Sequence, residues 1–193
     1  FFAYDGGRWG TAGGMSLDGG QTWMPFTRVQ RGTEYGDIYW NGRDSTVYAV
    51  THEPYYSLLS DDAGRSWQRL DKNENGKKPT LASSGVGLID RKPLVRYDAN
   101  KDGGIIQWST AAGKSWRNVA NYRVTGRSVV HYGSKVYWTT TQGVITSTDG
   151  KNWTLTGPGA EGASYGPYFG SSDQEFVVVT GTSFLKTEDG GKT

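Results

Sequence analysis

Residues 16–23 read SLDGGQTW, and near copies of this octapeptide recur along the chain. Residues 60–67 read SDDAGRSW, and residues 109–116 read STAAGKSW. Residues 147–153 read STDGKNW, one residue shorter, and residues 187–193 read TEDGGKT. We call each copy a box. The four box tryptophans lie 37 to 49 residues apart, which is typical of a protein built from repeated structural units.

The residue types in the box are those of a tight turn. The Asp carboxylate accepts backbone N–H groups across the turn, and the Ser or Thr hydroxyl completes the hydrogen bonding. Glycine adopts the positive φ that such a turn needs, and the tryptophan supplies a large apolar wedge suited to a gap between packed sheets. The residues assigned to these turns are Ser16, Asp18, Gly20 and Trp23; Ser60, Asp62, Gly64 and Trp67; Ser109, Gly113 and Trp116; Ser147, Asp149 and Trp153; and Thr187, Asp189 and Gly191.

Short apolar or aromatic segments flank every box and predict four strands per unit. Around the fourth box they are residues 127–132, 135–139 and 143–146 before it and 153–155 after it. Four strands in a unit of about 40–50 residues are typical of β-propeller blades. The second strand of a unit is apolar at consecutive positions, most clearly at 176–179, which predicts burial on both faces.

Composition supports an all-β fold and excludes several classes of function. Glycine accounts for 29 of 193 residues, roughly twice the usual share, and there are 8 Trp and 12 Tyr. With no cysteine, disulfides, thiolate zinc sites and a cysteine nucleophile are excluded for these residues. A net charge of +2 argues against nucleic-acid binding. No apolar run approaches the roughly 20 residues of a membrane-spanning helix, so we expect no membrane insertion.

The boxes resemble the Asp-box, or BNR, repeats of sialidase-like β-propellers, and the resemblance covers essentially all 193 residues. It implies blades of four antiparallel strands, with each box on a hairpin turn at the blade periphery, away from the functional face. Two departures stand out: Ala111 replaces the box Asp of the third copy, and the fourth box is shortened.

We expect residues 1–193 to form one propeller domain of about four and a half blades. The chain begins where a second strand is expected and ends inside the fifth box, so we expect it to be a segment of a six- or seven-bladed ring. A five-bladed ring closed by an unusual seam is the alternative. The resemblance also implies a secreted, periplasmic or cell-surface protein.

Ligands of propellers usually meet the face formed by the loops between blades and the loops between second and third strands. The residues predicted to bind ligand on this face are Trp9, Arg31, Glu34, Arg123 and Arg127. A sialidase grips a carboxylate with three arginines and uses a tyrosine nucleophile activated by a glutamate. Glu161 with Tyr165, or Glu34 with Tyr35, supplies such a pair, but the Arg-Ile-Pro motif of sialidases is absent from these residues.

The segment HEPYY at residues 52–56 is the densest polar and aromatic cluster. His52 and Tyr55 suit the base and acid of a polysaccharide lyase, with an arginine neutralising a uronate. Two other interpretations stay open: aromatic rings that stack on a sugar, and a proline-containing turn whose tyrosines pack on a neighbouring blade. The catalytic candidates are therefore His52, Tyr55, Glu161 and Tyr165.

Asp98, Asn100 and Asp102 follow the first half of a calcium-loop pattern, as do residues 71–76. The positions where a bidentate Glu would complete each loop hold Ser109 and Ala82, so a plain Asp/Asn/Gly hairpin turn is the alternative. The sequence allows Ca²⁺ at this loop and requires no cofactor.

Together these patterns predict a sialidase-like Asp-box propeller that recognises carbohydrate, with anionic glycans among the candidates. It would form part of a secreted glycan-processing enzyme, either a glycoside hydrolase or a polysaccharide lyase. Whether the chain is itself an enzyme stays open. The alternative is a non-catalytic propeller that serves as a protein-interaction or assembly scaffold, because an aromatic- and arginine-rich face suits either function.

Overall fold

The computed structural model is all-β apart from one short 3-10 helix, η1 (Pro158–Ala160). It describes residues 2–4, 13–26, 34–40, 44–52, 57–69, 86–89, 94–98, 104–109, 115–126 and 129–193. The chain forms two compact units, one of Phe1–Ser83 with Ala112–Lys114 and the other of Ser84–Ala111 with Ser115–Thr193. Among the described residues, no helix is long and apolar enough to cross a membrane.

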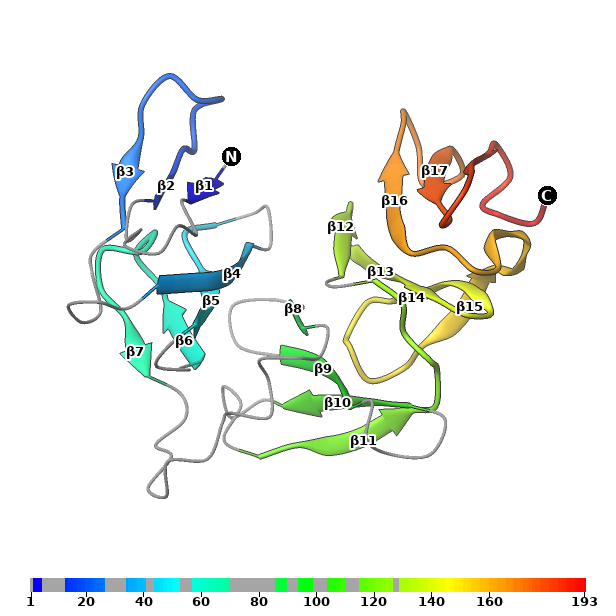
Figure 1. The fold of residues 1–193 in the computed structure, drawn as a ribbon, viewed down its shortest axis with the longest axis horizontal. Coiled ribbons are helices and arrows are strands. Elements are labelled where there is room, and N and C mark those ends of the chain that lie inside the picture. Colours follow the sequence, from blue (N-terminus) through cyan, green and yellow to red (C-terminus); the bar gives the residue numbers. More distant parts are fainter. Residues whose placement is uncertain are drawn as a thin grey trace. The chain divides into compact units, whose positions relative to one another are not determined.

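The first unit contains two antiparallel sheets whose strands follow one another in chain order (Figure 1). The first is three-stranded: β1 (Phe2–Tyr4), β2 (Gly13–Met15) and β3 (Met24–Pro25). The second is four-stranded: β4 (Glu34–Trp40), β5 (Val47–His52), β6 (Ser57–Ser60) and β7 (Gln68–Arg69). Each box turn of this unit joins the last two strands of its sheet.

The second unit contains three antiparallel sheets, again with sequential strands (Figure 1). Two are four-stranded: β8 (Val86–Leu88), β9 (Leu94–Asp98), β10 (Ile105–Ser109) and β11 (Arg117–Ala120); and β12 (Val130–Tyr132), β13 (Lys135–Thr140), β14 (Gly143–Ser147) and β15 (Thr154–Gly157). The third has three strands: β16 (Tyr165–Phe169), β17 (Phe176–Val179) and β18 (Phe184–Thr187). The two four-stranded sheets match the predicted pattern of four strands around a box.

The second strands of the sheets form the centre of the core. In β13 the five residues 136–140 are all buried, and in β5 the residues Val47, Tyr48 and Ala49 are fully buried, as the consecutive apolar pattern predicts. In β17 the prediction of burial on both faces is wrong for one face. Phe176 and Val178 are buried, whereas residues 177 and 179 are half-exposed.

Box turns are held by the Asp carboxylate in a repeated pattern. In the second box, the Ser60 hydroxyl donates to Asp62 Oδ1 at 2.8 Å and accepts the Gly64 N–H at 2.7 Å. Ser66 donates its backbone N–H to Asp62 Oδ1 at 2.8 Å and its hydroxyl to Oδ2 at 2.6 Å. Equivalent bonds surround the aspartates of the first, fourth and fifth boxes, Asp18, Asp149 and Asp189. Residues 110–114 of the third box lie outside the described residues.

The box tryptophans are less buried than their expected role as wedges implies. Trp67 is half-buried against the ring of Phe26, with ring centroids 5.8 Å apart, and Trp153 is half-buried against Trp138 at 5.9 Å. Trp23 is 48% exposed, although its indole N–H donates to the carbonyl of Gly20 at 3.1 Å. The indoles of Trp23 and Trp153 each close their own turn, because Trp153 likewise donates its N–H to the carbonyl of Gly150.

Candidate functional site

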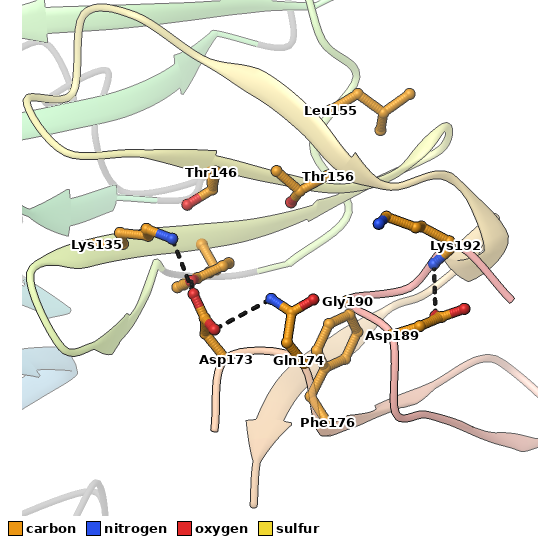
Figure 2. Close-up of a pocket in the computed structure, with 11 residues that line it drawn as sticks. Lys135, Thr146, Leu155, Thr156, Asp173, Gln174, Phe176, Asp189, Gly190 and Lys192 are labelled. Atoms are coloured by element: carbon orange, nitrogen blue, oxygen red, sulfur yellow. Dashed lines mark hydrogen bonds and ion pairs between the residues drawn. The ribbon is translucent and has the colours of Figure 1, made fainter. Parts of the chain in front are cut away.

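A pocket of about 370 Å³ lies between the sheet of β12–β15 and the sheet of β16–β18, both within the second unit (Figure 2). Its walls come from β13, β14 and β15, from the turn between β16 and β17, and from the fifth box. The lining residues are Lys135, Tyr137, Thr146, Leu155, Thr156, Asp173, Gln174, Phe176, Asp189, Gly190 and Lys192.

Asp173 is the polar centre of this pocket. Its Oδ2 accepts the Lys135 ammonium at 2.8 Å and the Tyr137 hydroxyl at 3.3 Å, while its Oδ1 accepts the Gln174 side-chain amide at 3.1 Å. Figure 2 shows the carboxylate between Lys135 and Gln174. The bond from Lys135 lowers the pKa of Asp173, and the same bond raises the pKa of Lys135, so both groups are charged at neutral pH.

The fifth box forms the opposite wall because its turn lies against the β16–β17 turn. The Gly190 N–H donates to the Gln174 carbonyl at 2.9 Å, and a Cβ on Gly190 would come within 3.0 Å of Gln174 Oε1. The Lys192 N–H donates to Asp189 Oδ1 at 3.0 Å, and Figure 2 shows the Lys192 side chain extending toward Thr156. Because the turn of the fifth box packs closely against Gln174 at Gly190, Lys192 becomes the second lysine that lines the pocket.

Hydroxyl and apolar groups complete the lining. The hydroxyls of Thr146 and Thr156 donate to the carbonyls of Val136 and Val144 at 3.0 and 3.2 Å, so their oxygens stay available as acceptors. Phe176 and Leu155 add apolar surface. Within the described ranges, no three His, Cys, Asp or Glu side chains gather as a metal site. The pocket thus combines hydrogen-bond donors and acceptors with an apolar wall.

Of the residues predicted from the loop pattern, the structure describes the side chains of Arg123, Glu161 and Tyr165, and none of these three lines this pocket. Arg123 is exposed, and its carbonyl accepts the Thr141 N–H at 2.9 Å. Thr125 donates its hydroxyl to the carbonyl of Ala163. The loops after β11, between β13 and β14, and before β16 therefore lie close together. Glu161 and Tyr165 lie in this last loop and at its end, and Tyr165 is 54% exposed.

Several predicted residues cannot be placed. Trp9, Arg31, Tyr55, Arg127, Asn100 and Asp102 lie outside the described residues. Of Glu34 and His52 the structure describes the backbone, and the two are cross-strand partners at the ends of β4 and β5. Asp98 pairs with Ile105 at the β9–β10 connection, so the predicted calcium loop falls between two strands of one hairpin.

Sequence reasoning missed the pocket because its groups come from five separate segments. Lys135 and Tyr137 alternate along one strand, while Asp173 and Gln174 stand in a turn of the next sheet. The fifth box was assigned a structural role alone. The available signal was the polar turn SSDQE at residues 171–175, placed directly before the apolar strand β17.

Comparisons with known proteins identify the fold. No protein-family model matches the sequence, and no curated protein matches it. A solved structure titled "YCF48 bound to D1 peptide" is 18% identical with a TM-score of 0.46, and the match covers 98% of this chain and 76% of that one. The nidogen chain of a nidogen/laminin complex is 16% identical with a TM-score of 0.50, over 88% of this chain and 66% of that one. The latter similarity shows a β-propeller-like fold.

Proposed function

We propose that this propeller-like chain recognises carbohydrate and that the sugar binds in the pocket around Asp173. The observation that carries the proposal is the carboxylate of Asp173, fixed by Lys135, Tyr137 and Gln174 at the edge of a cavity. A charged group held in this way makes strong hydrogen bonds to hydroxyls without losing side-chain freedom on binding. The volume of the cavity also suits a small ligand, because small-molecule sites usually measure about 300–1,000 Å³.

Sugar hydroxyls both donate and accept hydrogen bonds, and the pocket offers partners for both. The remaining N–H groups of Lys135 and Gln174 donate, while the oxygens of Thr146 and Thr156 accept. Phe176 provides apolar surface for the C–H groups of a sugar ring. This mixture fits a sugar better than a purely apolar ligand, which would leave the polar groups unpaired.

The two lysines favour sugars that carry a carboxylate. Lys135 is neutralised by Asp173, whereas the Lys192 ammonium has no acidic partner among the described residues. A uronate or similar acidic sugar would place its carboxylate beside Lys192 and its hydroxyls beside Asp173. An exposed cation at the rim of a pocket also speeds encounter with anionic ligands.

Binding to a panel of neutral and uronate-containing oligosaccharides, measured by calorimetry, tests the proposal. We expect a uronate oligosaccharide to bind the native chain and Asp173→Asn to lower its affinity at least about tenfold, which is 1.4 kcal/mol. The matched control is Glu188→Gln, which removes the same charge at an exposed ion pair with Lys186 outside the pocket. Absence of binding across the panel, or equal loss in both variants, would contradict the proposal.

A second candidate function, a protein-interaction scaffold, is favoured by one feature. Phe184 and Leu185 of β18 are 79% and 37% exposed. Adjacent exposed apolar side chains on a strand are typical of a surface that another polypeptide covers. This feature is independent of the sugar pocket.

A further inference from the structure

The sequence holds one acceptor pattern for N-linked glycans. Such a site needs an asparagine, then any residue except proline, then serine or threonine. Of the seven asparagines in these 193 residues, Asn152 alone is followed in this way, by Trp153 and Thr154. The pattern begins in the fourth box and ends at the first residue of β15, so the turn of the box decides whether these side chains are accessible.

Asn152 has a place in the turn that other boxes give to a hydroxyl. In the second box the Ser66 hydroxyl donates to Asp62 Oδ2 at 2.6 Å. In the fourth box the side-chain amide of Asn152 donates to Asp149 Oδ2 at 2.8 Å, and its backbone N–H donates to Asp149 Oδ1 at 2.9 Å. Two bonds to one carboxylate therefore fix the asparagine at the turn.

The turn places no such requirement on residue 154. In the first three boxes the residue after the tryptophan differs each time: Met24, Gln68 and Arg117. Thr154 pairs with Thr146 of β14, and β15 is an edge strand of its sheet. Asn152 and Thr154 are both exposed. The two residues that define the acceptor pattern thus lie together on the surface of the folded chain.

The side chains on either side of Asn152 are held against neighbouring sheets. The Lys151 ammonium lies 4.3 Å from the centre of the Trp108 ring, over the sheet of β8–β11. The Trp153 ring lies against Trp138 of its own sheet, with ring centroids 5.9 Å apart. Because both neighbours have partners of their own, Asn152 stays exposed between them.

A modified amide can keep the bond that holds the turn. An asparagine amide carries two N–H groups, and attachment of a sugar replaces only one of them. The remaining N–H can still donate to Asp149 Oδ2, and the backbone bond to Asp149 Oδ1 does not involve the amide. The folded turn is therefore compatible with a glycan on Asn152.

We infer that Asn152 is an acceptor for N-linked glycosylation when the chain passes through a secretory pathway. The donor is an oligosaccharide carried on a polyprenyl diphosphate. Asn152 Nδ2 bonds to the anomeric carbon of the first sugar, the bond from that carbon to the diphosphate oxygen breaks, and polyprenyl diphosphate leaves. The displaced amide proton passes to a base of the transferase, so nothing is oxidised or reduced. Asn152 does not line the pocket around Asp173, and the inference is independent of sugar binding there.

Expression of the whole chain behind a secretion signal in a eukaryotic cell that glycosylates its secreted proteins tests the inference. Intact mass spectrometry of the protein from cells and medium together is expected to show one added glycan, which a peptide N-glycosidase removes. Asn152→Gln and Thr154→Ala should lose the added mass, whereas Thr154→Ser should keep it. Asn121→Gln is the matched control and should also keep it, because Asn121 is exposed but lies outside any acceptor pattern. Analysis of the cells as well as the medium includes variants that fold poorly.

Thermal unfolding of the chain with the glycan, and of the same chain made without it in bacteria, tests whether the turn accepts the sugar. Because the bonds to Asp149 are retained, we expect the two midpoints to agree within about 2 °C. The inference is overturned if the native chain gains no mass, or if the added mass persists in Asn152→Gln. A midpoint lower by more than this in the glycosylated chain overturns it as well, because the turn would then lose its bonds on modification.

Discussion

Phe26 lies directly against Gly64, so closely that a Cβ on Gly64 would come within 2.0 Å of Phe26 Cδ1. Phe26 follows the last strand of the first sheet, and Gly64 belongs to the box of the next sheet. Box glycines also approach the preceding sheet in the second unit, where a Cβ on Gly150 would come within 2.7 Å of Ile89, next to β8, and one on Gly191 within 2.6 Å of Gly157, at the end of β15. The box glycine is therefore a point of contact between consecutive sheets as well as a turn residue.

This relationship predicts a large loss of stability for Gly64→Ala. The new methyl group clashes with a buried aromatic ring, and the φ of +80° is unfavourable for alanine. We expect a loss of about 2–4 kcal/mol in the free energy of unfolding, measured in urea. Gly19→Ala is the control, because Gly19 has a φ of +75° and open space around it, so only about 1 kcal/mol is expected. Equal losses would show that the contact with Phe26 is unimportant.

Removing a box carboxylate tests the turn itself. Asp62→Ala leaves the backbone N–H and the hydroxyl of Ser66 without their acceptor, and we expect a loss of about 1 kcal/mol, as for a helix cap. Asp61→Ala changes the neighbouring exposed aspartate, whose backbone carbonyl, retained in the variant, accepts the Ser45 hydroxyl. Thermal unfolding of both variants should show a lower midpoint for Asp62→Ala alone. A similar midpoint for both would argue against the carboxylate's role.

The same carboxylates predict how stability depends on pH. Hydrogen bonds from Thr22 and Ser66 lower the pKa of Asp18 and Asp62 from 3.8 to about 2. Because these pKa values are lower in the folded chain than in the unfolded one, the stabilisation is present above pH 3.8 and disappears as the pH falls through about 2. We expect the urea midpoint to fall steadily from pH 4 to pH 2, with a smaller slope in Asp62→Asn. If the urea midpoint of Asp62→Asn fell with pH as steeply as that of the native chain, Asp62 would not be a source of the pH dependence.

The pattern of the boxes predicts much of this fold, and individual residues show why. The spacing of the boxes and the apolar segments around them predict the antiparallel four-stranded sheets, because the strands of each sheet follow one another in the sequence. The prediction of burial on both faces is wrong for β17, where residues 177 and 179 are half-exposed. The pocket around Asp173 was not predictable, since it depends on how the β16–β17 turn meets the fifth box at Gly190. Such a contact between segments leaves no periodic signal in the sequence.

Two variants decide which end of the sheets binds sugar. Arg123 lies where three loops meet, and the sequence predicts it as a ligand-binding residue. The pocket proposal expects Arg123→Ala to retain affinity for the uronate oligosaccharide and Lys135→Ala to lose most of it. In Lys135→Ala the carboxylate of Asp173 loses its strongest partner and with it the fixed geometry of the site. Titration calorimetry measures both, and the opposite ranking would move the site to the loops.

The proposal assigns the preference for acidic sugars to the charge of Lys192. Lys192→Gln should weaken binding of a uronate oligosaccharide several-fold and leave binding of its carboxyl-reduced neutral analogue unchanged. Uronate affinity of the native chain should also fall as salt rises from about 50 to 200 mM, because an exposed cation is screened. Equal weakening for both sugars would show that Lys192 contributes through the packing of its side chain and not through its charge. That result would leave sugar binding in place and remove the preference for acidic sugars.

Chemical-shift mapping of the labelled chain during titration with a uronate oligosaccharide tests the central claim most directly. The pocket predicts shifts concentrated at the amides of Lys135, Thr156, Gln174 and Lys192, with the Asp173→Asn variant showing much smaller shifts at the same sugar concentration. Shifts confined to the loops around Arg123 and Thr141, or no shifts at all, would contradict the proposal that this pocket binds carbohydrate.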